Sequence, residues 1–152
     1  MKNIIASILM GIALLIPTNF SENKEIYNNI EKIEVIIDSE VKVIDKDSKY
    51  LKDLVNICGD MLQNAHEMPA FSVSLDNETR VKKNNGTWVE IYFIKTLSHN
   101  ELPFDRLLIE IEPEWTGFNI IRYYENKYEG RCFYIDLVDK DMSKLYKMLN
   151  NI

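Results

Sequence analysis

Histidine and recognisable catalytic motifs are scarce in this 152-residue chain, which contains two histidines and two cysteines. HEMPA at His66 lacks the second histidine, four residues on, that a zinc metalloprotease helix requires. Asp45 begins a stretch that resembles a calcium-binding loop, but Tyr50 and Asn56 stand where that loop needs glycine and an acid. No serine, histidine and acid set accompanies a nucleophile turn. We therefore predict no metal, no cofactor and no catalytic residue, and interpret His66 as a helix-end residue and His99 as a loop residue.

Clustered positive charge is also lacking. Lysine and arginine number 18 against 24 acidic residues, which gives a net charge of −6. Nucleic acid and anionic lipid headgroups both reward clustered Lys and Arg. We therefore expect no nucleic-acid partner and no membrane binding by the folded surface. The composition, 46% hydrophobic and 28% charged, is typical of a single globular domain.

The longest apolar run is short and lies at the N-terminus, from Ile4 to Ile16, after Lys2. Such a run is too short to cross a membrane comfortably and is typical of a secretory signal. We predict a signal peptide at residues 1–21 and a secreted or envelope-associated, extracytoplasmic protein. No A-x-A triplet follows the run, so an uncleaved N-terminal membrane anchor is the alternative. A spacer is expected at residues 22–31.

The two cysteines, Cys58 and Cys132, have two interpretations. In an exported chain an even pair favours a disulfide, which here would join the central helix to a strand near the C-terminus. The alternative is two buried free thiols that behave as small hydrophobic side chains.

Residues 46–66 show an unambiguous helical period. Apolar residues from Tyr50 to Ala65 recur at three- and four-residue spacing, which places them in one stripe. Asp47 or Ser48 can accept hydrogen bonds from the first amides of the helix. The pattern predicts a long helix with a single buried face.

Period-two alternation dominates the rest of the chain. Residues 32–45 alternate on both sides of a break at Asp38-Ser39, which predicts a hairpin or a bulged strand. Asn84–Gly86 favours a tight hairpin turn, and Ser98–Asn100 is interpreted as a looser loop. Further elements are predicted as strands at 70–76, 88–94, 106–112, 118–125 and 131–137, and as a final amphipathic helix at 139–150 capped by Asp139.

Sequential hairpins imply an antiparallel sheet. We predict one α+β domain at residues 32–152, with two layers: an antiparallel sheet of about five to six strands, one long helix packed on it, and a short C-terminal helix.

Three stretches carry a resemblance: KIEVIIDSEVKVIDKDSKYLKDLVNI, NGTWVEIYFI and YEGRCFYIDLVDKDMSKLYKMLNNI. Their order resembles that of small exported α+β proteins of low-GC Gram-positive bacteria, many of them lipoproteins and uncharacterised. The resemblance implies a fold and a compartment, and it implies no catalytic residues. Those relatives usually carry a lipobox cysteine, which this chain lacks after its apolar run.

One predicted sheet face gathers aromatic and charged side chains from three strands, because alternate residues share a face and adjacent strands bring them together. One interpretation is a binding platform for a cationic peptide or a sugar, or a pair of carboxylates for glycoside hydrolysis. The other is an ordinary solvated face in which Glu90 or Glu110 pairs with Arg122. The candidate binding residues are Trp88, Glu90, Tyr92, Glu110, Glu112, Arg122 and Tyr124.

Two functional hypotheses follow. The first is a non-catalytic extracytoplasmic module that binds an unknown protein or peptide through this face, for example as an inhibitor or immunity-type partner. The second is a small cell-envelope hydrolase that uses two of Glu90, Glu110 and Glu112. We favour the first, because the chain has no recognisable nucleophile or metal set and a flat open face does not exclude water as a catalytic pocket does.

Overall fold

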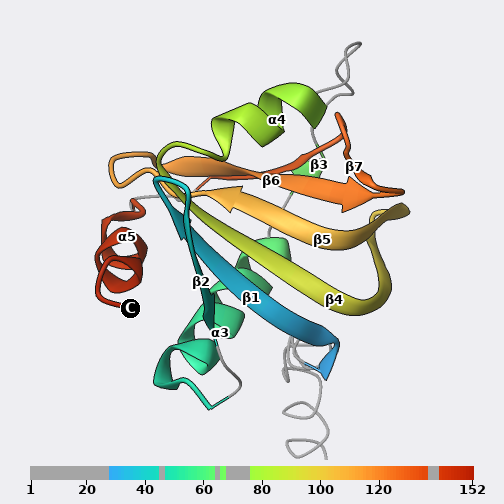
Figure 1. The fold of residues 1–152 in the computed structure, drawn as a ribbon. Helices are drawn as coiled ribbons and strands as arrows, with labels where there is room; N and C mark the ends of the chain where they lie inside the picture. Colours follow the sequence, from blue (N-terminus) through green and yellow to red (C-terminus); the bar gives the residue numbers. More distant parts are fainter. Residues whose placement is uncertain (1–27, 45–46, 64–65, 68–75, 137–140) are drawn as a thin grey trace, which may run out of the picture.

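The computed structural model describes residues 28–44, 47–63, 66–67, 76–136 and 141–152. They form one antiparallel sheet in the order β2-β1-β4-β5-β6-β8-β3, with β7 paired to β6, and three helices (Figure 1). The predicted α+β class and antiparallel sheet are confirmed. The predicted single long helix as the second layer is wrong, because the helical residues are divided among three helices and the sheet dominates the fold.

The first hairpin joins β1 (Ile30–Ile37) to β2 (Glu40–Ile44). Asp38 and Ser39 turn the chain with positive φ angles of 46° and 74°, the geometry of a two-residue hairpin. The hairpin prediction is therefore confirmed. β1 begins inside the stretch that we expected to be a spacer.

The second hairpin joins β4 (Thr87–His99) to β5 (Leu102–Glu110). The predicted loop at Ser98–Asn100 is wrong, since β4 continues to His99 and only Asn100 and Glu101 turn, with φ of 48° and 64°. The strand continues because Leu97, Ser98 and His99 pair with residues 102–104 of β5. The His99 ring also packs edge-to-face on Phe133 at 5.0 Å between centroids.

The far side of the sheet is built from short strands: β6 (Gly117–Tyr124), β7 (Lys127–Tyr128), β8 (Phe133–Asp136) and β3 (His66–Glu67). A Cβ on Gly117 would lie 2.8 Å from the Ile135 carbonyl oxygen, so the close approach of β6 to β8 requires glycine there. His66 was expected at a helix end, which is wrong. It pairs with Tyr134 across β3 and β8, and the two rings lie 5.5 Å apart.

The helix α3 (Lys49–Gln63) lies within the predicted range. Ser48 accepts a hydrogen bond from the Tyr50 amide at 3.2 Å through its side-chain oxygen, which confirms one of the two expected caps.

The other two helices differ from the predictions. Residues 76–82 form α4 (Asp76–Lys82), where we expected the end of a strand at Asp76 and no further element before the turn at Asn84–Gly86. Asp76 pairs with Arg80 one helical turn on at 2.9 Å. The rest of that predicted strand lies outside the described residues. The last helix, α5 (Ser143–Leu149), begins later than predicted. The Asp141 carboxylate accepts from the Ser143 amide at 3.0 Å, and Asp139 lies outside the described residues.

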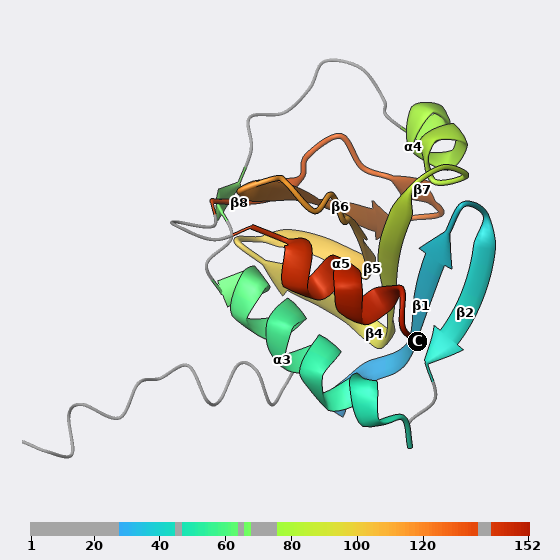
Figure 2. The ribbon, with the colours of Figure 1, turned by 90° about the vertical axis from the view of Figure 1, so that its left-hand side faces the viewer.

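The helices cover opposite faces of the sheet (Figure 2). On the core face, α3 and α5 bury their apolar side chains against the strands in one large cluster. The opposite face, called the α4 face, has a smaller apolar cluster made of Ile36, Trp88, Leu108, Tyr123 and Tyr128. No helix within the described ranges is both long and apolar enough to span a membrane.

Candidate functional site: the α4 face

Cross-strand pairing gathers the polar residues of the α4 face into rows. Tyr92 lies opposite Lys32 on one side and Arg106 on the other, and Arg106 lies opposite Tyr123. Because paired residues in an antiparallel sheet point to the same face, these four side chains form a continuous row across β1, β4, β5 and β6. Tyr128 of β7 extends the row beyond Tyr123.

Cations and aromatic rings alternate along this row. The Lys32 ammonium lies 4.1 Å from the centre of the Tyr92 ring. The Arg106 guanidinium lies between two rings, 4.6 Å from the centre of Tyr92 and 4.1 Å from that of Tyr123. Tyr123 then packs edge-to-face on Tyr128 at 5.0 Å. Each cation lies within the roughly 6 Å over which ring faces attract it, so the rings contribute to holding the positive charges of this row.

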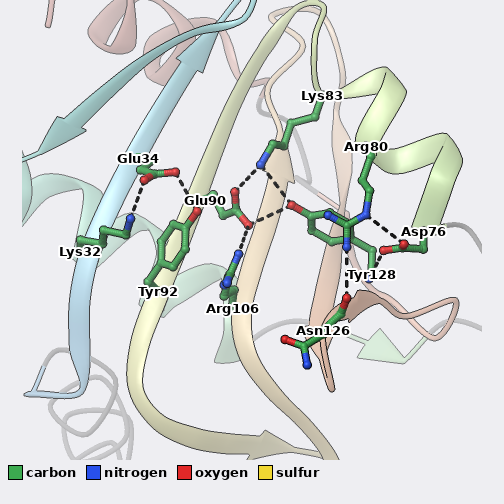
Figure 3. Close-up of polar contacts among 10 residues, drawn as sticks. All are labelled: Lys32, Glu34, Asp76, Arg80, Lys83, Glu90, Tyr92, Arg106, Asn126 and Tyr128. Carbon is green, nitrogen blue, oxygen red and sulfur yellow. Dashed lines mark hydrogen bonds and ion pairs between the residues drawn. The ribbon is translucent and has the colours of Figure 1, made fainter.

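At the centre of the α4 face lies the Glu90 cluster, which comprises Glu90, Lys83, Arg106 and Tyr128 (Figure 3). Glu90 is fully buried. Lys83 Nζ donates to Glu90 Oε2 at 2.6 Å, and the Tyr128 hydroxyl donates to Glu90 Oε1 at 2.9 Å. Arg106 Nη1 lies 3.8 Å from the same Oε1. A buried carboxylate is costly unless it is paired and hydrogen-bonded, and here both of its oxygens have partners.

The same contacts fix Tyr128. Its pKa is raised well above that of a free tyrosine by burial and by the neighbouring Glu90 charge. The hydroxyl therefore stays protonated and can donate to Glu90, and it also accepts from Lys83 at 3.2 Å. Both oxygens of Glu90 and the Tyr128 hydroxyl therefore have hydrogen-bond partners within the cluster.

Polar contacts bind α4 over this cluster. Asp76 bonds to Arg80 through one carboxylate oxygen and accepts from the Tyr128 amide at 2.7 Å through the other, and both bonds lower the Asp76 pKa. Arg80 Nη2 reaches the Asn126 carbonyl at 3.1 Å. At the other end of the helix, Lys82 pairs with Glu110 at 2.5 Å. These contacts join α4 to β5, to β7 and to the turn between β6 and β7, so the helix covers one half of the face.

On β1, Glu34 lies opposite Glu90 in the strand register. Two facing carboxylates repel unless each has its own cation. Lys32 donates to Glu34 at 2.7 Å, and the Tyr92 hydroxyl donates to it at 2.8 Å. Burial acts to raise the pKa of Glu34, but these two hydrogen bonds and the nearby lysine charges outweigh it, so the pKa is lowered. Glu34 therefore stays ionised beside Glu90.

On the half of the face formed by β2, β1 and the middle of β4, three apolar side chains are exposed, while Lys32, Glu34 and Tyr92 are partly buried. Val41 and Val43 of β2 lie opposite Ile36 and Glu34, so their side chains share the α4 face, and they are 57% and 50% exposed. Ile94, two residues after Tyr92 along β4, is 65% exposed. We call this surface the open half-face, and define it by Lys32, Glu34, Val41, Val43, Tyr92 and Ile94.

Four of the seven predicted site residues lie together as expected. Trp88, Glu90 and Tyr92 alternate along β4 on the α4 face, and Glu110 lies opposite Trp88. Trp88 is fully buried, and its indole donates to the Asn85 carbonyl at 2.6 Å. These four residues therefore lie together on the α4 face, on the neighbouring strands β4 and β5.

Of the other three residues, Arg122 and Tyr124 were placed wrongly on this face, and the strand register does not assign Glu112 to either face. Arg122 lies opposite Leu107, which belongs to the core-face cluster, so Arg122 faces away from Glu90 and cannot pair with Glu90 as predicted. It is buried, and donates to the carbonyls of Arg131 and Pro103. Burial lowers its pKa. Tyr124, two residues on, shares its side of β6. Glu112 lies beyond the end of β5.

The error has a physical cause. β6 is apolar on both sides, with Ile120 in the core cluster and Ile121 and Tyr123 packed on the α4 face. Alternation therefore cannot say which residues of this strand face which way. The cross-strand row was also missed. KIEV alternates and marks Lys32 and Glu34 as facing away from the core, but DRLL has two polar residues followed by two apolar ones and so does not show which way Arg106 faces. The residues missed are Lys32, Glu34, Lys83, Arg106, Tyr123 and Tyr128.

Cys132 is a free, buried thiol in the structure, and burial raises its pKa to about 11. The structure therefore has no disulfide at Cys132, and the side chain of Cys58, its predicted partner, lies outside the described residues. Among the described residues, no three His, Cys, Asp or Glu side chains are grouped as they would be around a metal ion.

Comparison with known protein families, with curated proteins and with solved structures found no match to this chain.

Proposed function

We propose that the protein is a non-catalytic, extracytoplasmic binding module that recognises a protein or peptide through the open half-face. One observation carries the proposal: Val41, Val43 and Ile94 are exposed on the same side of the sheet as the ion-paired Lys32 and Glu34. Exposed apolar side chains gathered on one face and bordered by polar groups are typical of protein interaction sites. The N-terminal apolar run supports the proposed compartment.

The composition of the open half-face suits a protein partner better than a sugar or a nucleic acid. Its charged pair, Lys32 and Glu34, is neutral overall, so it creates no net positive potential that would attract a polyanion such as nucleic acid. The Tyr92 ring is already covered by Lys32 and Arg106, at 4.1 and 4.6 Å, and so is not free to stack on a sugar. The interactions still open to a partner are apolar contacts with Val41, Val43 and Ile94, which apolar side chains of a protein can make.

The hydrolase hypothesis has less support. A general acid must lie within hydrogen-bond reach of the substrate, but Glu90 is fully buried and both of its oxygens are bonded within the protein. Glu110 is paired with Lys82. Neither carboxylate is arranged for proton transfer to an external molecule.

Cross-linking capture tests the proposal. Tagged full-length protein is incubated with the envelope fraction of the source organism, cross-linked and analysed by mass spectrometry. Ile94→Asp and Val43→Asp should each lower recovery of the same partner about tenfold or more, because each removes apolar contact worth roughly 1.5–3 kcal/mol when fully buried.

Val81→Asp is the matched control. Val81 is 66% exposed on α4, outside the open half-face, and its replacement should leave capture unchanged. Equal capture by all three variants and the wild type would show that the open half-face is not the binding surface. Thermal unfolding of each variant checks that the fold is retained.

A further inference from the structure

Beyond the proposed function, and independently of it, we infer that two copies of this chain associate by antiparallel pairing of their β2 strands. β2 ends the strand order, and β1 is its only partner among the described residues. All four residues from Glu40 to Val43 are exposed. Within the described part of the chain, the outer edge of β2 is therefore unpaired, and such an edge is a template for pairing with another strand.

The hairpin geometry shows which backbone groups are available. In a hairpin with a two-residue turn, the residues that flank the turn exchange both of their hydrogen bonds, and the bonded pairs then alternate. Ile37 and Glu40 flank the turn here, and Val35 pairs with Lys42. The amides and carbonyls of Val41 and Val43 therefore point outward, away from β1, toward an incoming strand.

Charge complementarity favours a second copy as that strand. Glu40 and Lys42 lie on the side of β2 opposite to the exposed valines, with opposite charges two residues apart. When the strand pairs antiparallel with itself about Val41, Glu40 of each copy lies directly opposite Lys42 of the other. Opposite charges at these positions stabilise strand pairing, and like charges destabilise it.

The pairing would satisfy outward backbone groups of Val41, bring the exposed Val41 side chains of the two copies into contact, and form an isologous interface around a two-fold axis. Lys42 also donates to the Ile152 carbonyl on the core-face side, which orients this edge of the hairpin. Two open half-faces would then lie side by side on one continuous sheet.

Sedimentation equilibrium tests this inference by comparing the full wild-type chain with two charge-reversal variants. The wild type should show a concentration-dependent mass that rises from 17.9 kDa toward twice that value. Glu40→Lys and Lys42→Glu should each weaken self-association about tenfold or more, because like charges then meet across the interface. Mixing the two variants should restore the dimer, since the two lysine side chains at the β2 edge of one variant then face the two glutamate side chains of the other.

Two results would overturn the inference. One is a wild type that stays monomeric up to its highest soluble concentration. The other is a dimer that neither charge reversal weakens, which would place the contact elsewhere on the surface. Thermal unfolding of each variant distinguishes lost association from lost folding. Partner capture by the wild type, and its loss in the Ile94→Asp protein, is a separate readout, so failure of the dimer leaves the proposed binding function standing.

Discussion

The two halves of the α4 face use polar residues in opposite ways. In the half under α4, Glu90, Lys83 and Tyr128 satisfy one another around a fully buried carboxylate. In the open half-face, Val43 and Ile94 are exposed, and the Lys32–Glu34 pair is partly buried, with side chains 39% and 13% exposed. Buried charges are retained only where they are fully paired. The comparison indicates that the covered half stabilises the fold and that the open half is available to a partner.

The largest expected effect of a change is in the covered half. Lys83→Met removes the 2.6 Å ion pair and leaves Glu90 buried, with Arg106 at 3.8 Å as its remaining cation. We expect the free energy of unfolding to fall by about 2–3 kcal/mol, somewhat less than the usual cost of breaking a buried pair because Arg106 remains. Urea unfolding measures this change.

Lys82→Met is the matched control for that variant, because its partner Glu110 lies at a more exposed site. The control should cost at most about 1 kcal/mol, as exposed ion pairs do. Equal losses in the two variants would remove the distinction between a buried, stabilising cluster and an ordinary surface pair.

A smaller effect is expected at Glu34, which belongs to the open half-face and lies opposite Glu90. Its pKa is lowered from an ordinary value of 4.5 in the folded state. Ionised Glu34 therefore contributes stability that is fully present above about pH 4.5 and is lost as the pH falls through the lowered pKa. Glu34→Gln should cost about 1 kcal/mol near neutral pH, the value of a typical hydrogen bond, and progressively less in acid.

Urea unfolding between pH 2 and pH 7 follows this difference. Tyr92→Phe, which removes one of the two hydrogen bonds to Glu34, should reduce the acid-dependent part without abolishing it. A stability difference that does not change with pH would mean that the charge of Glu34 is not what the surrounding donors stabilise.

Local sequence patterns predicted the parts of the fold that have one clear period. The β1–β2 hairpin followed from alternation around Asp38 and Ser39, and α3 followed from its single apolar stripe and Ser48. Helix α4 was missed because DNETRVK is short and polar, and the residues that hold it, such as Glu110 and Tyr128, lie far along the chain.

The candidate site was predictable only in part. Trp88, Glu90 and Tyr92 were found because Glu90 marks one side of β4 as polar. On β6 the charged side chain, Arg122, lies on the core side, so the same argument assigned the wrong side. No periodic pattern could have predicted the position of Lys83. It follows α4 in the chain, and only the packing of that helix brings its ammonium to Glu90. Strand pairing and helix placement, rather than local pattern, decide which side chains meet.

Site-specific photo-cross-linking in the source cells most directly tests the division between the two halves. A photoreactive side chain is placed at Ile94 in the open half-face and, in a second protein, at the equally exposed Val81 on α4. Our account predicts one discrete cross-linked protein from position 94 and none from position 81. Cross-linking from position 81 with none from position 94 would contradict it.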